Sequence, residues 1–195
     1  MTSISPLQNV LTKGLHGDYE GKSRDNLIKI KEIKNLLIVQ IAQYKNSSFQ
    51  IKNVNIDGLS FPEKALKVNS SQDSRILWCG PKNWLFISNK KDLIKNIKEN
   101  FNQKNFAITD LSHSRTIVEL EGENSKEVLK KGCPFNFNDM QKNVCVNSLF
   151  NGITITIDML DDSPDKIRLF ALRSFGESLY HSITDASLEF GYEAV

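Results

Sequence analysis

Residues 144–157 read Val-Cys-Val-Asn-Ser-Leu-Phe-Asn-Gly-Ile-Thr-Ile-Thr-Ile, a pattern typical of a β-hairpin. Two strand-like runs flank Asn151-Gly152, a pair that tolerates the positive φ angles of a two-residue type I′ turn. In the second run, isoleucines alternate with threonines. We therefore expect the three isoleucines to face a core and the threonines and Asp158 to face outward.

The segment before this hairpin predicts a strand and a short helix. Thr116 to Glu121 alternates apolar with acidic residues, as a strand with one buried face does. Asn124 and Glu127 have the spacing of a capping box, which marks the start of a helix, and Gly132 with Pro134 marks its end.

The segment after the hairpin predicts one more strand and a final helix. Residues 161–164, Asp-Asp-Ser-Pro, form a turn signal, and Lys166 to Leu172 reads as a strand. Ser174 and Glu177 form a second capping box. The apolar stripe of the final helix consists of Leu179, Ile183, Ala186 and Phe190, before Gly191.

The first half of the chain shows the same succession of elements. Leu36 to Tyr44 reads as a buried strand, and residues 75–79 and 84–88 read as a hairpin around Gly80 to Asn83. Asp92 to Asn102 has helical apolar spacing. We predict an α+β fold of two similar strand, hairpin and helix halves, 34–105 and 106–195, that make one compact domain overall.

An N-terminal arm, residues 1–33, precedes these halves, and we expect it to be extended with little structure of its own because it is polar and glycine-containing. Its apolar residues Leu7, Val10, Leu11 and Leu15 would share one face of a short helix. Two interpretations stay open. The arm docks on a partner subunit, or it covers the core of its own chain.

Composition excludes several classes of protein. The 25 basic and 23 acidic side chains leave a net charge of +2, with no block of five or more like charges, which does not favour nucleic acid or an anionic membrane as partner. We expect a cytoplasmic protein, because no run suits a signal peptide or a membrane span. The spacing of Cys79, Cys133 and Cys145 suggests neither disulfides nor a zinc site, and we expect all three to be reduced and buried.

The segment Ser112-His113-Ser114-Arg115 is the strongest candidate for chemistry. Adjacent residues do not form a Ser-His relay unless the chain folds back, so a structural role is favoured, with the hydroxyls bonding the loop and Arg115 held by a carboxylate. A subunit contact is the other interpretation. Neither a Gly-x-Gly-x-x-Gly pattern nor a phosphate-binding loop signature occurs in the sequence.

Trp78 and Trp84 lie at the two ends of the first hairpin turn. Large aromatic side chains usually belong to the core, and we expect this of at least one of them. An exposed tryptophan would be a candidate for a hot spot in a protein interface.

Several motifs occur in a fixed order along the chain: Ser5-Pro6-Leu7, Leu59-Ser60-Phe61-Pro62, residues 76–85 (Ile-Leu-Trp-Cys-Gly-Pro-Lys-Asn-Trp-Leu), residues 110–116 (Asp-Leu-Ser-His-Ser-Arg-Thr), Lys131-Gly132-Cys133-Pro134 and Leu172-Arg173-Ser174-Phe175. This order resembles the gamma subunit of heterotetrameric sarcosine oxidase. The family is in turn similar in fold to the folate-binding domains of aminomethyltransferases, which implies the paired architecture predicted above.

This resemblance implies a non-catalytic subunit of a complex that demethylates sarcosine to glycine, with transfer of the one-carbon unit to tetrahydrofolate or release of formaldehyde. It implies alpha, beta and delta subunits as partners, and these would hold FAD, FMN, NAD, tetrahydrofolate and zinc, with no cofactor bound by this chain. Candidate interface residues are Trp78, Trp84, His113, Arg115, Leu7 and Leu11.

Alternatives stay open at this point. The chain could be the equivalent subunit of a related dehydrogenase, such as one for N-methylglutamate, or a free-standing folate-binding module. The family commonly has Leu-Asp-Leu after Cys-Pro, where folate enzymes place a functional carboxylate. Here the segment is Phe135-Asn136-Phe137, and an asparagine does not act as a base, although Asp139 is close by.

Overall fold

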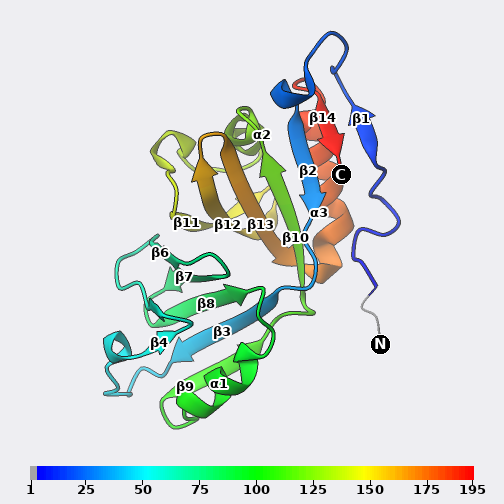
Figure 1. The fold of residues 1–195 in the computed structure, drawn as a ribbon. Coiled ribbons are helices and arrows are strands. Elements are labelled where there is room, and N and C mark those ends of the chain that lie inside the picture. The colour runs from blue at the N-terminus through cyan, green and yellow to red at the C-terminus, as the bar shows by residue number, and fades with distance from the viewer. Residues whose placement is uncertain (1–3) are drawn as a thin grey trace. The chain divides into compact units, whose positions relative to one another are not determined.

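The computed structural model describes residues 4–195 and contains two compact units (Figure 1). Unit 1 comprises the chain up to Lys34, residues 114–142 and residues 146–195, whereas unit 2 comprises residues 35–113 and 143–145. Each unit has its own β-sheet and at least one helix, so the α+β prediction is confirmed. The chain leaves unit 1 after Lys34 and returns to it after His113.

Unit 1 is built on a seven-stranded sheet with the order β1-β14-β2-β10-β13-β12-β11. The strands are β1 (Gly14–His16), β2 (Ile28–Glu32), β10 (Arg115–Glu121), β11 (Cys145–Phe150), β12 (Ile153–Asp162), β13 (Asp165–Leu172) and β14 (Tyr192–Ala194). Strand β2 pairs with β10 in the antiparallel sense and with β14 in the parallel sense. A strand from the start of the chain is therefore an inner strand of the sheet.

Two helices, α2 (Ser125–Lys130) and α3 (Gly176–Ser187), pack against each other and against β13. Apolar side chains of the sheet alternate toward them, for example Val118 and Leu120 on β10, which are fully buried. The predicted hairpin at Asn151-Gly152 is confirmed, since both residues have positive φ and β11 lies beside β12. The final helix is also confirmed.

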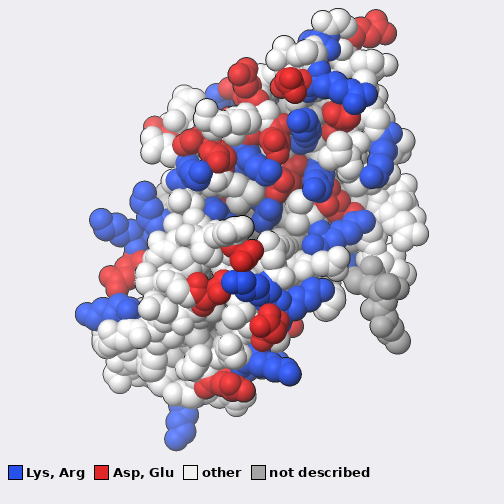
Figure 2. Space-filling model, in the orientation of Figure 1, with Lys and Arg blue, Asp and Glu red and all other residues white. Residues whose placement is uncertain are grey.

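The other face of the sheet carries rows of alternating charge, which we call the charge ladder. Register places Lys31, Glu119, Arg168 and Asp158 opposite one another on β2, β10, β13 and β12. A second row consists of Glu193, Lys29, Glu121, Lys166 and Asp161. Directly opposite residues share a face, so each charge has neighbours of opposite sign. Figure 2 shows basic and acidic side chains interspersed on the face in view, with no large area of one sign.

Unit 2 is built on a five-stranded sheet with the order β6-β7-β8-β3-β9, and a short β4-β5 pair. The strands are β3 (Leu37–Gln43), β4 (Asn55–Ile56), β5 (Leu59–Ser60), β6 (Val68–Ser70), β7 (Ser74–Gly80), β8 (Asn83–Ser88) and β9 (Phe106–Asp110), and the helix is α1 (Leu93–Asn100). The predicted hairpin between β7 and β8 is confirmed, with Trp78 opposite Trp84.

The core of unit 2 is rich in aromatic rings. Phe61 lies edge-on to Trp84 and to Phe101, at centroid distances of 5.2 and 5.7 Å, and Phe101 lies edge-on to Phe106 at 4.9 Å. Such edge-to-face contacts add to the free energy gained by burying the rings. Ile97 anchors α1 on this cluster.

Residues 4–33 are not an arm without structure of their own, and this differs from the predicted division into 1–33, 34–105 and 106–195. Leu7, Ile28 and Ile30 are fully buried, and β2 is hydrogen-bonded on both sides. The chain covers its own core with this segment, as the second of the two interpretations held. The alternation Ile28-Lys29-Ile30-Lys31, with one apolar and one charged face, explains why it forms a strand.

Smaller predictions differ as well. Asn124 makes no side-chain hydrogen bond at the start of α2. Ser174 is not the N-cap of α3, because it lies in a 3-10 turn (Arg173–Phe175) that leads directly into the helix, and the N-cap is Phe175.

Asp158 is buried rather than outward-facing, since it lies in the charge ladder opposite Arg168. All three cysteines carry thiol groups rather than disulfides, but Cys79 is only half-buried. Among residues 4–195, no helix has the length and apolar character that crossing a membrane requires.

Candidate subunit-contact site

The Ser112-His113-Ser114-Arg115 segment is the point where the chain returns from unit 2 to unit 1. In unit 2, the Ser112 hydroxyl donates to Asp110 Oδ1 at 2.6 Å and accepts from the Ile38 backbone N–H at 3.0 Å. The hydroxyl therefore ties β9 to β3. Ser112 and His113 form no relay, and the structural interpretation holds for Ser112.

Asp110 is held ionised by its surroundings. Burial alone would raise the pKa of this carboxyl, but hydrogen bonds from the Ser112 side chain and backbone and the positive charges of His113 and Lys98 outweigh burial, so the pKa is lowered. His113 itself is exposed. Its imidazole is free to meet solvent or another protein.

Arg115 begins β10 in unit 1 and is half-buried. Its guanidinium donates long hydrogen bonds, 3.4 Å to the Ser114 carbonyl and 3.3 Å to the Ser114 hydroxyl. Burial lowers the pKa of Arg115. The expected carboxylate partner is not found: within residues 4–195, no ion pair involves Arg115.

The two tryptophans have different surroundings. Trp84 is 4% exposed, and its indole N–H donates to the Pro62 carbonyl at 2.8 Å, so it belongs to the core of unit 2 and offers no surface to a partner. Trp78 is half-buried and packs against the same cluster from its edge. Of the pair, only Trp78 keeps part of its ring accessible.

Leu7 and Leu11 are positioned by a turn of the N-terminal segment. The Leu11 N–H donates to the Leu7 carbonyl at 2.9 Å, and the Ser5 hydroxyl accepts from the Leu7 N–H at 3.1 Å. Leu7 is fully buried in unit 1, which removes it from the interface candidates, whereas Leu11 is half-buried.

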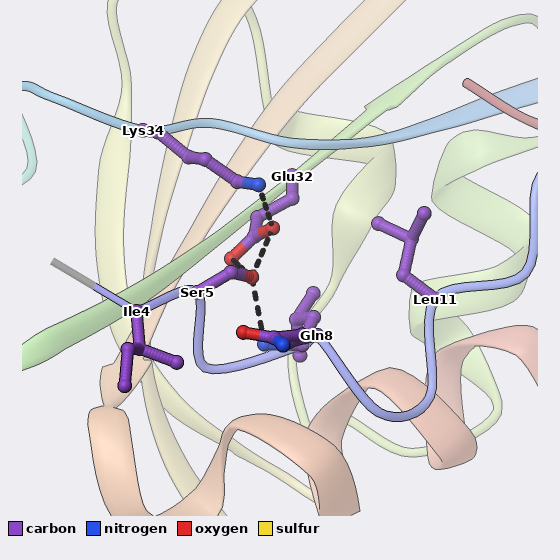
Figure 3. A pocket seen from close by; sticks show the side chains of 7 residues that line it. Ile4, Ser5, Gln8, Leu11, Glu32 and Lys34 are labelled. Atoms are coloured by element: carbon purple, nitrogen blue, oxygen red, sulfur yellow. Dashed lines mark hydrogen bonds and ion pairs between the residues drawn. The ribbon is translucent and has the colours of Figure 1, made fainter. Parts of the chain in front are cut away.

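Leu11 lines an open groove of about 510 Å³ in unit 1, shown in Figure 3. Glu32 also lines the groove, is 8% exposed, and accepts hydrogen bonds from the Ser5 hydroxyl at 2.6 and 2.7 Å and from the Lys34 ammonium at 3.0 Å. Its charge is thus balanced and its oxygens are satisfied. The remaining lining residues are Ile4, Leu7 and Gln8. The carboxylate that lines the groove is therefore paired within unit 1.

Asn136 occupies the sequence position after Cys-Pro where a carboxylate would be expected in a folate enzyme. Its side-chain amide donates to Asp139 Oδ2 at 2.7 Å and its amide oxygen accepts from the Asn138 N–H at 3.2 Å. Asn136 and Asp139 hold each other at an exposed turn before β11. No set of three or more His, Cys, Asp or Glu side chains in the described part of the chain is placed to hold a metal ion.

Sequence reasoning missed a group of exposed apolar residues in unit 1. Ile4, Leu172 and Phe175 are 70%, 46% and 47% exposed. Leu172 and Phe175 belong to a motif that the sequence had singled out, but Ser174 was interpreted there as a cap. An apolar residue directly before and after Arg173-Ser174 was the signal that could have found them.

Comparisons with known proteins agree on one family. The profile of the "Sarcosine oxidase, gamma subunit family" matches residues 44–189. The sarcosine oxidase subunit gamma of Corynebacterium sp. (strain U-96) is 28% identical over 119 residues, which span 59% of this chain and 57% of that protein. The sequence match therefore covers little more than half of the curated relative.

Solved structures show the same fold. A chain of the heterotetrameric sarcosine oxidase from Corynebacterium sp. U-96 superposes with a TM-score of 0.77 at 20% identity, covering 86% of this chain and 87% of that one. Aminomethyltransferase T of the glycine cleavage system from Bartonella henselae superposes with a TM-score of 0.63 at 12% identity, covering 88% and 48%. Because the family profile spans most of the sequence, this chain belongs to the sarcosine oxidase gamma subunit family.

Proposed function

We propose that this chain is a non-catalytic subunit of a heterotetrameric oxidase that demethylates sarcosine to glycine, passing the one-carbon unit to tetrahydrofolate or releasing formaldehyde. The observation that carries the proposal is the family match over residues 44–189, joined to a fold shared with a chain of the Corynebacterium heterotetramer. Alpha, beta and delta subunits are the proposed partners. FAD, FMN, NAD, tetrahydrofolate and zinc are assigned to those subunits.

The candidate nucleophiles of this chain support a non-catalytic role. The Ser112 hydroxyl is committed to Asp110 and to the backbone of β3. Burial raises the pKa of the Cys133 thiol to about 11, against a weaker opposing hydrogen bond with Ser148, so the thiol stays protonated near neutral pH. Neither group is activated for attack on a substrate.

Purification at native abundance tests the proposal. A tagged chain should bring larger flavin-containing chains with it, and the complex should oxidise sarcosine. The chain alone should be colourless and inactive. Stoichiometric flavin on the isolated chain, or sarcosine turnover by it, would contradict the proposal. Turnover of a different N-methyl amino acid by the complex would assign it to a related dehydrogenase.

A second candidate, a free-standing folate-binding module, is supported by the fold shared with aminomethyltransferase T. It requires a functional carboxylate after Cys-Pro, and Asp139 is the carboxylate side chain nearest in sequence to the expected position. Calorimetric titration of the isolated chain with tetrahydrofolate separates the two candidates. Binding in the micromolar range that Asp139→Asn abolishes would favour the module, whereas the oxidase subunit should give no heat.

A further inference from the structure

Three segments of unit 1 meet at one end of strands β10 and β13. The Arg173 N–H donates to the Ser114 carbonyl at 2.9 Å, and the Arg173 guanidinium donates to the Ile4 carbonyl. A methyl group placed on Gly176 would lie 2.5 Å from Thr116 Oγ1 and 3.2 Å from Pro6 Cβ. The start of α3 is therefore packed tightly against residues 4–6 and 114–116.

Several apolar side chains at this tightly packed end of the sheet are exposed to solvent. Ile4, Leu172 and Phe175 are each about half exposed or more. The Leu172 side chain shares a face of the sheet with Arg115, because the two residues are directly opposite in the register of β10 and β13. We call Ile4, Arg115, Leu172, Arg173 and Phe175 the arginine–apolar patch. Leucine, isoleucine and phenylalanine gathered around arginine are typical of the centre of a protein interface.

No carboxylate of the described residues balances the charge of the patch. Among residues 4–195, neither Arg115 nor Arg173 lies within ion-pair distance of a carboxylate, whereas Arg168 in the charge ladder is paired with Glu119 at 2.6 Å. The nearby carboxylates are used elsewhere: Glu32 is paired with Lys34, and Glu177 accepts from the Asn9 amide at 3.4 Å. Two guanidinium groups thus remain available for an acidic partner.

We propose that the arginine–apolar patch binds a segment of a partner subunit that presents a carboxylate beside a large apolar side chain. The carboxylate would meet the half-buried Arg115, whose planar donors suit bidentate pairing, and the apolar side chain would cover Leu172 and Phe175. Covering the patch removes apolar surface from water and completes the hydrogen bonding of Arg115 at the same time. The proposal rests on the proposed function, because it assumes assembly with larger subunits.

Two variants with matched controls test the proposal in the assembled complex. Arg115→Glu reverses one charge of the patch, and Lys13→Glu makes the same change at an exposed site of unit 1. Phe175→Ser removes one exposed apolar side chain, and Leu149→Ser removes another, 44% exposed, from edge strand β11. Each tagged variant is co-expressed with the other subunits, and the dissociation constant is measured by dilution and mass photometry.

Arg115→Glu and Phe175→Ser should each weaken assembly by about tenfold or more, while Lys13→Glu and Leu149→Ser stay within about twofold of the wild type. Amide exchange of residues 170–176 should slow on assembly of the wild type. Because Phe175 is exposed, its substitution should leave the fold intact. The Phe175→Ser variant therefore tests the proposal even if Arg115→Glu lowers the melting temperature. If both patch variants assemble with wild-type affinity, the proposal for the patch is overturned and the proposed function is unaffected. A wild-type chain that binds no larger subunit overturns the proposed function as well.

Discussion

The cores of the two units show two different ways of stabilising a β-sheet. Unit 2 closes around edge-to-face rings of Phe61, Trp84, Phe101 and Phe106, whose contribution depends on volume and shape. Unit 1 packs aliphatic side chains on its helical face and lays the charge ladder across the other. Cavities should therefore be the main weakness of unit 2, whereas unit 1 should also respond to charge and pH.

Trp84→Ala should have the largest effect, because it opens a cavity in the ring cluster and leaves the Pro62 carbonyl without its donor. We expect a loss of about 3–5 kcal/mol in the free energy of unfolding. Urea denaturation followed by circular dichroism measures this loss. Tyr44→Ala in the same unit, where the ring is 45% exposed, is the control and should cost less than about 1 kcal/mol. Equal effects of the two substitutions would refute the assignment of Trp84 to the core.

Leu7→Ala tests whether unit 1 depends on the N-terminal segment. Leu7 is fully buried, so its truncation should cost about 2–4 kcal/mol, although the residue is far in sequence from the strands that it covers. Leu11→Ala is the matched control. Because Leu11 is half-buried, its truncation should cost about 1 kcal/mol, which is similar to the free energy of burying one or two CH₂ groups. An unchanged melting temperature for Leu7→Ala would restore the picture of a loosely attached arm.

Elements whose contacts are local were predictable from the sequence. Both hairpins and α3 follow from turn residues and from apolar periodicity within about 15 residues of chain. Strand β2 pairs instead with β10 and β14, more than 80 residues distant in sequence, and periodicity gives no information on such partners. Most of the residues around Ile28 and Ile30 in the sequence are polar, so the sequence alone did not predict that these two residues belong to an inner strand.

The candidate site was predictable only in part. Motif order identified Arg115 and the segment around Arg173, but burial decided against Leu7 and Trp84, and burial depends on which distant segments cover a residue. Capping boxes failed for a similar reason, since the 3-10 turn before α3 is held by Ser114 and Ile4 from other parts of unit 1. Local sequence rules describe isolated helices better than helices with tertiary contacts.

Glu119→Gln should weaken the charge ladder at its centre. Arg168 and Lys166 would lose a carboxylate that is 6% exposed, at a cost of about 2 kcal/mol, less than for a fully buried pair because both cations reach solvent. Glu121→Gln is the control; its carboxylate is 34% exposed, and a cost below about 1 kcal/mol is expected. Chemical denaturation measures both, and recovery of stability in Glu119→Met with Arg168→Met would show that unpaired charge is the cause.

Stability at high pH should show the smallest difference between the units that can still be measured. The two acidic groups with strongly raised pKa values, Cys133 and Tyr180, both lie in unit 1. Burial raises the pKa of Cys133 to about 11 from an ordinary value of 9.0, and burial together with the charge of Tyr192 raises the pKa of Tyr180 to about 12 from 10.0. Well below pH 9.0 these groups are protonated in the folded and the unfolded chain alike. As pH rises further, the unfolded chain loses protons that the folded chain keeps, so stability falls.

Free energies of unfolding measured between pH 7 and pH 11 test this expectation, and each variant serves as its own reference at pH 7, where packing effects alone remain. Tyr180→Phe keeps the ring and removes the ionisable group, so the decline above its ordinary pKa of 10.0 should become shallower. Cys133→Ala should do the same from its ordinary pKa of 9.0 upward. The pKa of Lys166 is raised by its hydrogen bond to Glu121, so part of the decline should persist in both variants. A decline of unchanged slope in both variants would show that alkaline sensitivity does not arise from Cys133 and Tyr180.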